Sequence, residues 1–192
     1  MPPTYRSLAA LSLAFGVSSL MTGSTLAAQE HATHPPVQAA APALDDATIV
    51  AIFDNANTAD IETGKLAAER GQSNEVRQFG AMLARDHAMV RQQGRDLAKK
   101  LGVTPTPPAD DKSAQEQAAV IRRLNALRAA EFDRAFLERE VQFHSDVIAA
   151  IKTTLLPAIK NEELKALVVK VAPAFQAHLQ MAQSLGKQLA AK

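Results

Sequence analysis

Three histidines give the strongest chemical signal in the sequence. His87, His144 and His178 each fall on the apolar face of a different predicted helix. That face is the one that an amphipathic helix buries against its neighbours. Neutral imidazole is the commonest protein ligand of zinc, copper and iron, so three inward rings indicate a metal site.

The three histidines are also predicted to lie at one height. Each is about three residues or fewer from the midpoint of its helix, which is roughly 5 Å at 1.5 Å per residue. Helix midpoints stay level whichever way the helices run, so the rings should meet inside a bundle. Glu62 lies equally near the midpoint of the first helix, on the flank of its apolar stripe. We therefore predict Glu62, His87, His144 and His178 as the metal ligands.

Three more acidic residues are predicted to support these ligands through hydrogen bonds. Asp86 adjoins one of the histidines, while Asp133 and Glu140 share the inward helix face that carries His144. Outer carboxylates commonly orient metal-binding imidazoles. Two other interpretations stay open. Glu140 could be a boundary residue that reaches solvent, and Asp133 a cap or the ion-pair partner of a nearby arginine.

The donor set suits borderline metals. Imidazole with one carboxylate fits zinc, copper, iron or nickel, and three His plus one Glu could close a tetrahedral site or leave one position open. The competing interpretation is a buried His, Asp and Glu network that only fixes the packing. The sequence thus predicts one transition-metal ion (zinc, iron or copper) or none.

The apolar periodicity predicts four long helices that position these side chains. They cover about residues 46–71, 74–101, 130–154 and 162–189. The first two are joined by a very short connection and must lie antiparallel. A proline-rich stretch and a shorter helix from Ser113 separate the second from the third. In the last helix Pro173 is predicted on the outer face, where a kink disturbs packing least.

These elements predict an all-α fold. Four long helices with one long connection in the middle are typical of a ferritin-like four-helix bundle, whose crossover here carries a short extra helix. A simple up-down-up-down bundle is the alternative. The bundle is predicted to span residues 45–192.

The N-terminal residues are predicted to lie outside the bundle. Residues 1–28 resemble a secretory signal peptide, with Arg6 before an apolar run and small residues near Ala27. Residues 29–44 are rich in Ala and Pro, as in a flexible linker. His31 and His34 fall in that linker and are expected to be solvated. The mature protein is therefore predicted in the periplasm or associated with the outer membrane.

Composition excludes several classes of function. The chain has no cysteine, hence no disulfide and no thiolate site. Its 21 basic and 20 acidic residues are interspersed, which argues against nucleic acid as a partner. The sequence lacks the basic amphipathic segment that is expected of a membrane-binding protein. No membrane insertion is expected after signal cleavage. The Ala-rich helix faces could support a homodimer.

Three blocks of the sequence resemble a known bacterial family. They read IETGKLAAERGQSNEVRQFGAMLARDH, FDRAFLEREVQFH and LVVKVAPAFQAHLQMAQSL. They are similar to exported ferritin-like proteins with a domain of unknown function, often given the label of outer-membrane protein. The likeness covers about residues 46–185.

The family pattern includes a Glu and an Asp-His pair, both in the first block, and one histidine in each of the two later blocks. Glu62, Asp86-His87, His144 and His178 match these positions. The resemblance implies a ferritin-like fold and supplies no activity. The Glu-x-x-His motifs of di-iron bundles are missing near the helix centres, so a mononuclear site or none fits better than ferroxidase chemistry.

Two functions compete at this point. One is an exported bundle that binds or buffers a transition metal, and the other is a structural or envelope-stress interaction protein with a polar core. An enzyme is the less favoured reading, since no nucleophile–base spacing and no phosphate loop occur. No catalytic residue is predicted.

Overall fold

The computed structural model describes residues 44–191. The predicted signal peptide and the predicted linker up to residue 43 lie outside the described residues. The described chain is helical, and the bounds of its elements are α1 Asp46–Arg70, α2 Asn74–Leu101, α3 Ser113–Ala126, α4 Ala129–Ala150, a π-helix Ile151–Leu155, α5 Leu156–Ala158 and α6 Glu162–Ala190. The predicted helix at 130–154 is thus an α-helix that ends in one π-helical turn.

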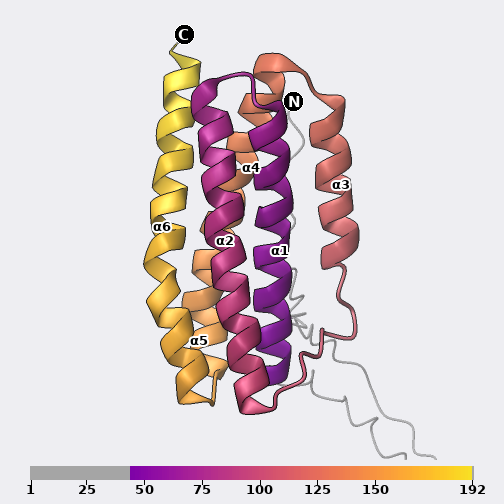
Figure 1. Ribbon diagram of the computed structural model, residues 1–192, viewed down its shortest axis with the longest axis vertical. Helices are drawn as coiled ribbons and strands as arrows, with labels where there is room; N and C mark the ends of the chain where they lie inside the picture. Colours follow the sequence, from indigo (N-terminus) through magenta and orange to yellow (C-terminus); the bar gives the residue numbers. More distant parts are fainter. Residues whose placement is uncertain (1–43, 192) are drawn as a thin grey trace, which may run out of the picture. The chain divides into compact units, whose positions relative to one another are not determined.

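The four long helices form two hairpins joined by a crossover (Figure 1). Helix α1 pairs with α2, and α4 pairs with α6. The connection that carries α3 runs the length of the bundle beside α1, so α4 runs parallel to α2. This is the connectivity of ferritin-like bundles. The predicted all-α four-helix bundle with a crossover helix is confirmed, and the simple up-down alternative is wrong.

Carboxylates tie each hairpin to the turn of the other. Asp46, at the start of α1, accepts hydrogen bonds from the backbone N–H groups of Lys160 and Asn161 (2.9 and 3.0 Å) in the turn before α6. Asp133 of α4 accepts from those of Gln72 and Ser73 (2.7 and 2.8 Å) between α1 and α2. Charge-assisted bonds of this kind are strong. They fix the longitudinal register of the two hairpins from both ends.

The core consists of two apolar clusters with a polar layer between them. One contains Ile49, Phe53, Val90, Ile151 and Phe175, among others. The other contains Ala67, Phe79, Leu83, Phe136 and Ala182, among others. Apart from Asp133 near the start of α4, the buried polar residues of the long helices fall between these two sets. The helices therefore place their polar side chains at one level, enclosed by apolar packing above and below.

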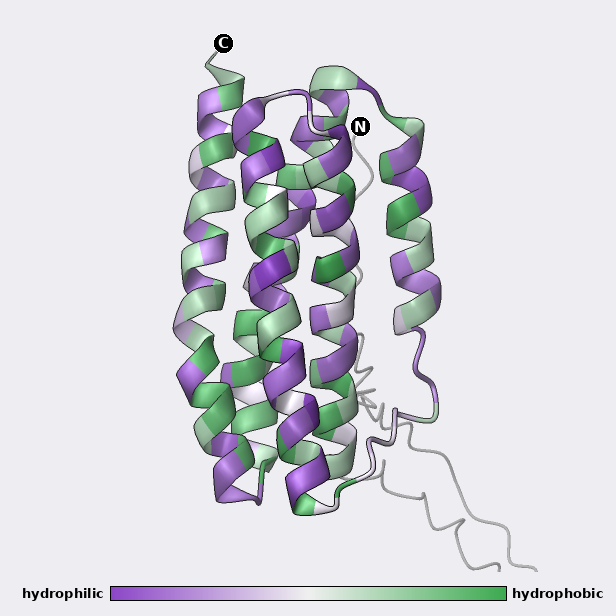
Figure 2. Cartoon of the chain, viewed as in Figure 1, coloured by the Kyte–Doolittle hydropathy of each residue, from purple (hydrophilic) through white to green (hydrophobic). Residues whose placement is uncertain are grey.

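The outer faces of the helices are mostly polar, with Met89, Val169 and Met181 as the large hydrophobic residues exposed among the described residues. Hydrophilic residues recur along every helix turned toward the viewer in Figure 2. Pro173 lies on the exposed face of α6, as predicted. Within residues 44–191, no helix is both long and apolar enough to cross a membrane.

Helices α1 and α2 approach each other closely where two glycines face each other. A Cβ added to Gly80 would lie 2.6 Å from the carbonyl oxygen of Gly64 and 2.7 Å from the amide nitrogen of Ala68. Real Cβ atoms do not approach backbone so closely, so any side chain at Gly80 must push the two helices apart.

We predict that Gly80→Ala lowers the free energy of unfolding by about 1–3 kcal/mol, the usual cost of overpacking. Gly186→Ala in α6 is the matched control, because a Cβ there meets nothing within 4 Å. That change should be neutral or stabilise by up to about 1 kcal/mol through helix propensity. Chemical denaturation of both variants measures the difference, and equal effects would contradict the close approach.

Candidate metal centre

The structure brings the three predicted histidines together in the polar layer. The ring centroids of His87 and His144 are 5.6 Å apart, those of His87 and His178 5.1 Å, and those of His144 and His178 5.4 Å. All three residues are buried. Phe175 stacks on the His87 ring at 5.3 Å between centroids, which seals one side of the group. One nitrogen from each ring lies within 4.8 Å of the others, as a shared metal ion requires.

The structure does not bring Glu62 to these histidines. Glu62 is exposed, and its carboxylate accepts a hydrogen bond from Gln117 of α3 at 3.1 Å. At 3.6 residues per turn, a residue two positions away points to nearly the opposite side of a helix. The inward acidic residue of α1 is therefore Asp60, which the sequence analysis missed.

Asp60 is fully buried and faces two of the imidazoles. Its Oδ2 lies 3.3 Å from Nε2 of His87 and 3.7 Å from Nε2 of His144. Its Oδ1 accepts a hydrogen bond from the guanidinium of Arg139. The inward carboxylate of α1 thus lies about half a turn before Glu62.

A second buried carboxylate lies on α4. Glu140 has no exposed surface, contrary to the alternative that it reaches solvent. Its Oε1 accepts from Nη1 of Arg139 at 2.8 Å, and its Oε2 lies 3.4 Å from Nδ1 of His144. The guanidinium carbon of Arg139 sits 3.9 Å from the centre of the Phe143 ring, a cation–π geometry. One guanidinium therefore contacts both buried carboxylates.

A hydrogen bond to Asn57 selects the tautomer of His87. The Asn57 side-chain amide donates to the carbonyl oxygen of Phe53 at 2.7 Å, so its Oδ1 faces Nδ1 of His87 at 2.9 Å. That oxygen can only accept, which requires a proton on Nδ1. The lone pair of His87 is then on Nε2, toward Asp60.

Hydrogen bonds also select the tautomers of the other two histidines. Nδ1 of His144 donates to the backbone carbonyl of Glu140 at 3.0 Å, which leaves the lone pair on Nε2. Nε2 of His178 donates to the Asp86 carboxylate at 3.2 Å, which leaves the lone pair on Nδ1. An oxygen acceptor behind each imidazole is the usual support of metal-binding histidines.

Five buried polar atoms of the cluster have no hydrogen-bond partner among the described residues. They are Oδ2 of Asp60, Nε2 of His87, Oε2 of Glu140, Nε2 of His144 and Nδ1 of His178. Unpaired buried acceptors are rare because each costs free energy to desolvate. Several lone pairs pointed at one place repel one another unless a cation lies between them. The donor set therefore fits a metal ion.

The three imidazoles have different pKa values because their surroundings differ. Burial lowers the pKa of His87 to about 3, and the neighbouring His144 and His178 add to this shift. Burial, then His144, also lowers the pKa of His178. Burial acts against protonation of His144 as well, but the Asp60 and Glu140 carboxylates outweigh it and raise the pKa of that ring. His87 thus stays neutral, with its lone pair available, in physiological conditions.

The two remaining predicted supporting residues lie in different places. Asp86 contacts His178 and the exposed Arg85, whose guanidinium is 3.0 Å away. A quarter of the Asp86 side chain is exposed, so this is the side of the cluster nearest to solvent. Asp133 is at the α1–α2 turn, where it acts as a cap, and it makes no hydrogen bond to any histidine of residues 44–191.

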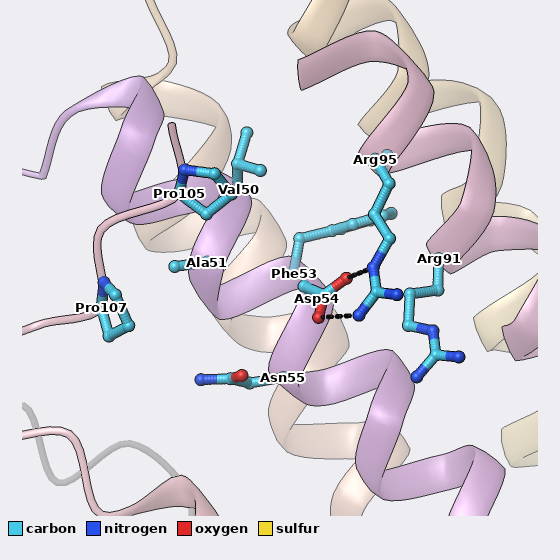
Figure 3. Close-up of a pocket in the computed structure, with 10 residues that line it drawn as sticks. Val50, Ala51, Phe53, Asp54, Asn55, Arg91, Arg95, Pro105 and Pro107 are labelled. Atoms are coloured by element: carbon cyan, nitrogen blue, oxygen red, sulfur yellow. Dashed lines mark hydrogen bonds and ion pairs between the residues drawn. The ribbon is translucent and has the colours of Figure 1, made fainter. Parts of the chain in front are cut away.

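One surface cavity lies away from the histidines. It has a volume of about 220 Å³ and lies between α1, α2 and the proline-rich segment (Figure 3). Asp54 and Arg95 form an ion pair along its wall, at 2.5 and 2.8 Å. None of the residues that line it belongs to the polar layer. The cavity and the histidine cluster are separate features.

Fold and site together define a crossover four-helix bundle with a buried histidine–carboxylate cluster in its middle layer. The chain belongs to the family described as Domain of unknown function (DUF4142), whose model matches residues 31–185. The resemblance seen in the three sequence blocks is confirmed at this level. A comparison with curated proteins gave no match.

Two solved structures share the fold. A DUF305 fragment from Deinococcus radiodurans has a TM-score of 0.65 at 16% identity and covers 74% of this chain and 95% of its own. CopM in its Cu(II)-bound form has a TM-score of 0.58 at 12% identity and covers 76% and 98%. At these identities the similarity establishes the helical-bundle fold.

The hydrogen bonds predict one tautomer for each ring of the metal-free protein. In alkaline solution, where His144 is neutral, His87 and His144 should carry the proton on Nδ1 and His178 on Nε2. Long-range ¹H–¹⁵N correlation spectra of the imidazoles measure this directly. The opposite tautomer at any of the three would contradict the lone-pair arrangement.

Proposed function

We propose that this bundle binds one transition-metal ion in its polar layer. The ligands are Nε2 of His87, Nε2 of His144 and Nδ1 of His178, with Asp60 as the acidic ligand in place of the predicted Glu62. The observation that carries the proposal is the meeting of three buried imidazoles, each with a ring nitrogen within 4.8 Å of the others, beside Oδ2 of buried Asp60, which lies 3.3 Å from Nε2 of His87 and 3.7 Å from Nε2 of His144. Asp86 and Glu140 support the ligands from behind.

The donor set favours copper or zinc. Three imidazoles and one carboxylate oxygen match the preferences of these borderline metals, and iron is the third candidate. CopM, a bundle of similar fold, has been solved in a Cu(II)-bound form, which supports keeping copper among the candidates. A divalent ion would also neutralise buried Asp60, whose charge is otherwise costly in an apolar interior.

Binding or buffering fits this site better than catalysis. Three histidines and one carboxylate can fill a tetrahedral shell, and closed shells of this kind are typical of sites that hold a metal without reacting. The site is enclosed by apolar clusters on both sides. The competing function, a scaffold with a metal-free polar core, predicts no dependence of stability on metal.

We further propose that the protein acts outside the cytoplasm. Support comes from the sequence of residues 1–28, with a charged start, an apolar run and a small-residue cleavage pattern. The mature protein would meet metal ions in the periplasm or at the outer membrane.

We predict that the full mature chain, purified without a polyhistidine tag, binds one Cu²⁺ or Zn²⁺ per chain. His87→Ala and His178→Ala should each weaken the affinity for the metal ion by about 100-fold or more. That is more than the usual effect of replacing a residue that only hydrogen-bonds to a ligand. Metal at 1,000 times its Kd should raise the free energy of unfolding by about 4 kcal/mol. Elemental analysis, competition titration and denaturation provide the measurements.

Glu62→Gln is the matched control, since Glu62 contacts α3 and not the histidines. It should bind metal like the parent chain. His31→Ala and His34→Ala, made together, remove the other histidines of the sequence and should leave the stoichiometry at one. If the parent chain holds no stoichiometric metal after loading with copper, zinc or iron, the proposed function is wrong and the scaffold function replaces it.

We predict that expression of the full sequence in a bacterium yields a periplasmic protein that lacks the first 27 or 28 residues. Signal peptidases cleave after small-x-small patterns such as the one that ends at Ala27. Intact-mass measurement of the periplasmic fraction reports the new N-terminus. Recovery of the full-length chain in the membrane fraction would show an uncleaved anchor instead.

A further inference from the structure

We propose that Arg139 occupies the place of a second cation and restricts the centre to one metal ion. This inference rests on the proposed metal-binding function and deepens it. It concerns two carboxylate oxygens that hydrogen-bond to Arg139, namely Oδ1 of Asp60 and Oε1 of Glu140.

A second set of donors exists beside the first. Asp60, Glu140 and His144 each offer a ligand atom within 4.8 Å of the others, and all three are buried. This set shares Asp60 and His144 with the ligands proposed above. When two donor sets share a carboxylate, that carboxylate can bridge two metal ions.

The guanidinium of Arg139 lies where a bridging ion would bind these carboxylates. Its Nη1 donates to Oδ1 of Asp60 and, at 2.8 Å, to Oε1 of Glu140. Stacking on Phe143 at 3.9 Å holds the guanidinium in this position. The two oxygens that a second ion would take are therefore already bonded.

Charge balance agrees with a single ion. Two buried carboxylates and one guanidinium leave one net negative charge among Asp60, Glu140 and Arg139, with the imidazoles neutral. Arginine keeps its proton throughout the accessible pH range. A metal ion can displace a proton from an imidazole, but no such exchange is open at Arg139. The second position thus stays closed whatever the metal concentration.

Replacing Arg139 by an apolar residue should open that position. Methionine has a similar length and carries no charge. The Arg139→Met chain would present two buried carboxylates and three imidazoles, which are enough donors for two ions with Asp60 between them. The added Glu140→Gln change removes one carboxylate and should close the second position again.

The test is Zn²⁺ stoichiometry by native mass spectrometry and elemental analysis, with His31 and His34 replaced by Ala throughout. We expect one Zn²⁺ in the parent chain, two in Arg139→Met, and one in Arg139→Met with Glu140→Gln. Arg134→Met is the matched control, an exposed arginine on the same helix, and it should bind one ion. Zn²⁺ is present during refolding, so that it can replace the lost charge.

The outcomes separate this inference from the function on which it rests. No bound Zn²⁺ in the parent chain would remove both. Two ions in the parent chain, or one in a folded Arg139→Met chain, would overturn the role of Arg139 and leave metal binding intact. If Arg139→Met fails to fold in saturating Zn²⁺ while the double variant folds, a second ion cannot replace the guanidinium, and the inference is wrong.

Discussion

The neutralisation of two carboxylates inside an apolar bundle is the constraint on which this structure depends. Asp60 and Glu140 are fully buried, and an isolated buried ion costs several kcal/mol even after relaxation. Arg139 supplies one compensating charge. The second must come from a proton on the most basic imidazole, His144, or from a metal ion among the lone pairs. A metal ion also removes the repulsion between those lone pairs, which a single proton cannot do.

Such a cluster needs helices that hold their heights relative to one another to within a fraction of a turn. Two features provide this. The carboxylates of Asp46 and Asp133 tie the ends of each hairpin to the turn of the other. Between those ends, the contact of Gly64 with Gly80 brings α1 and α2 close together. Short side chains on α1, such as that of Asp60, can then reach across to α2.

The sequence predicted the bundle, its crossover and the meeting of three histidines, because periodicity and helix midpoints fix those features. It missed the part of the site on α1. Phe53, Asn57, Asp60, Gly64 and Ala67 follow the alternating spacing of four and three residues that lines a helix–helix seam. Three of the five are polar or lack a side chain, so a search for apolar residues does not recognise the seam. Spacing alone could have found it.

Two remaining errors have physical causes that no single helix reveals. Helix α1 is covered by the bundle on one side and by α3 on another, which widens its buried face and made flanking Glu62 a plausible inward residue. Arg139 was not among the predicted site residues, because a long cation rarely lies in a core without partners. Its partners are Asp60 on another helix and the adjacent residue Glu140. One interpretation of the sequence placed Glu140 at the boundary with solvent. The burial of each of these charges is explained only by the others, so they become predictable as a group once the helices are paired.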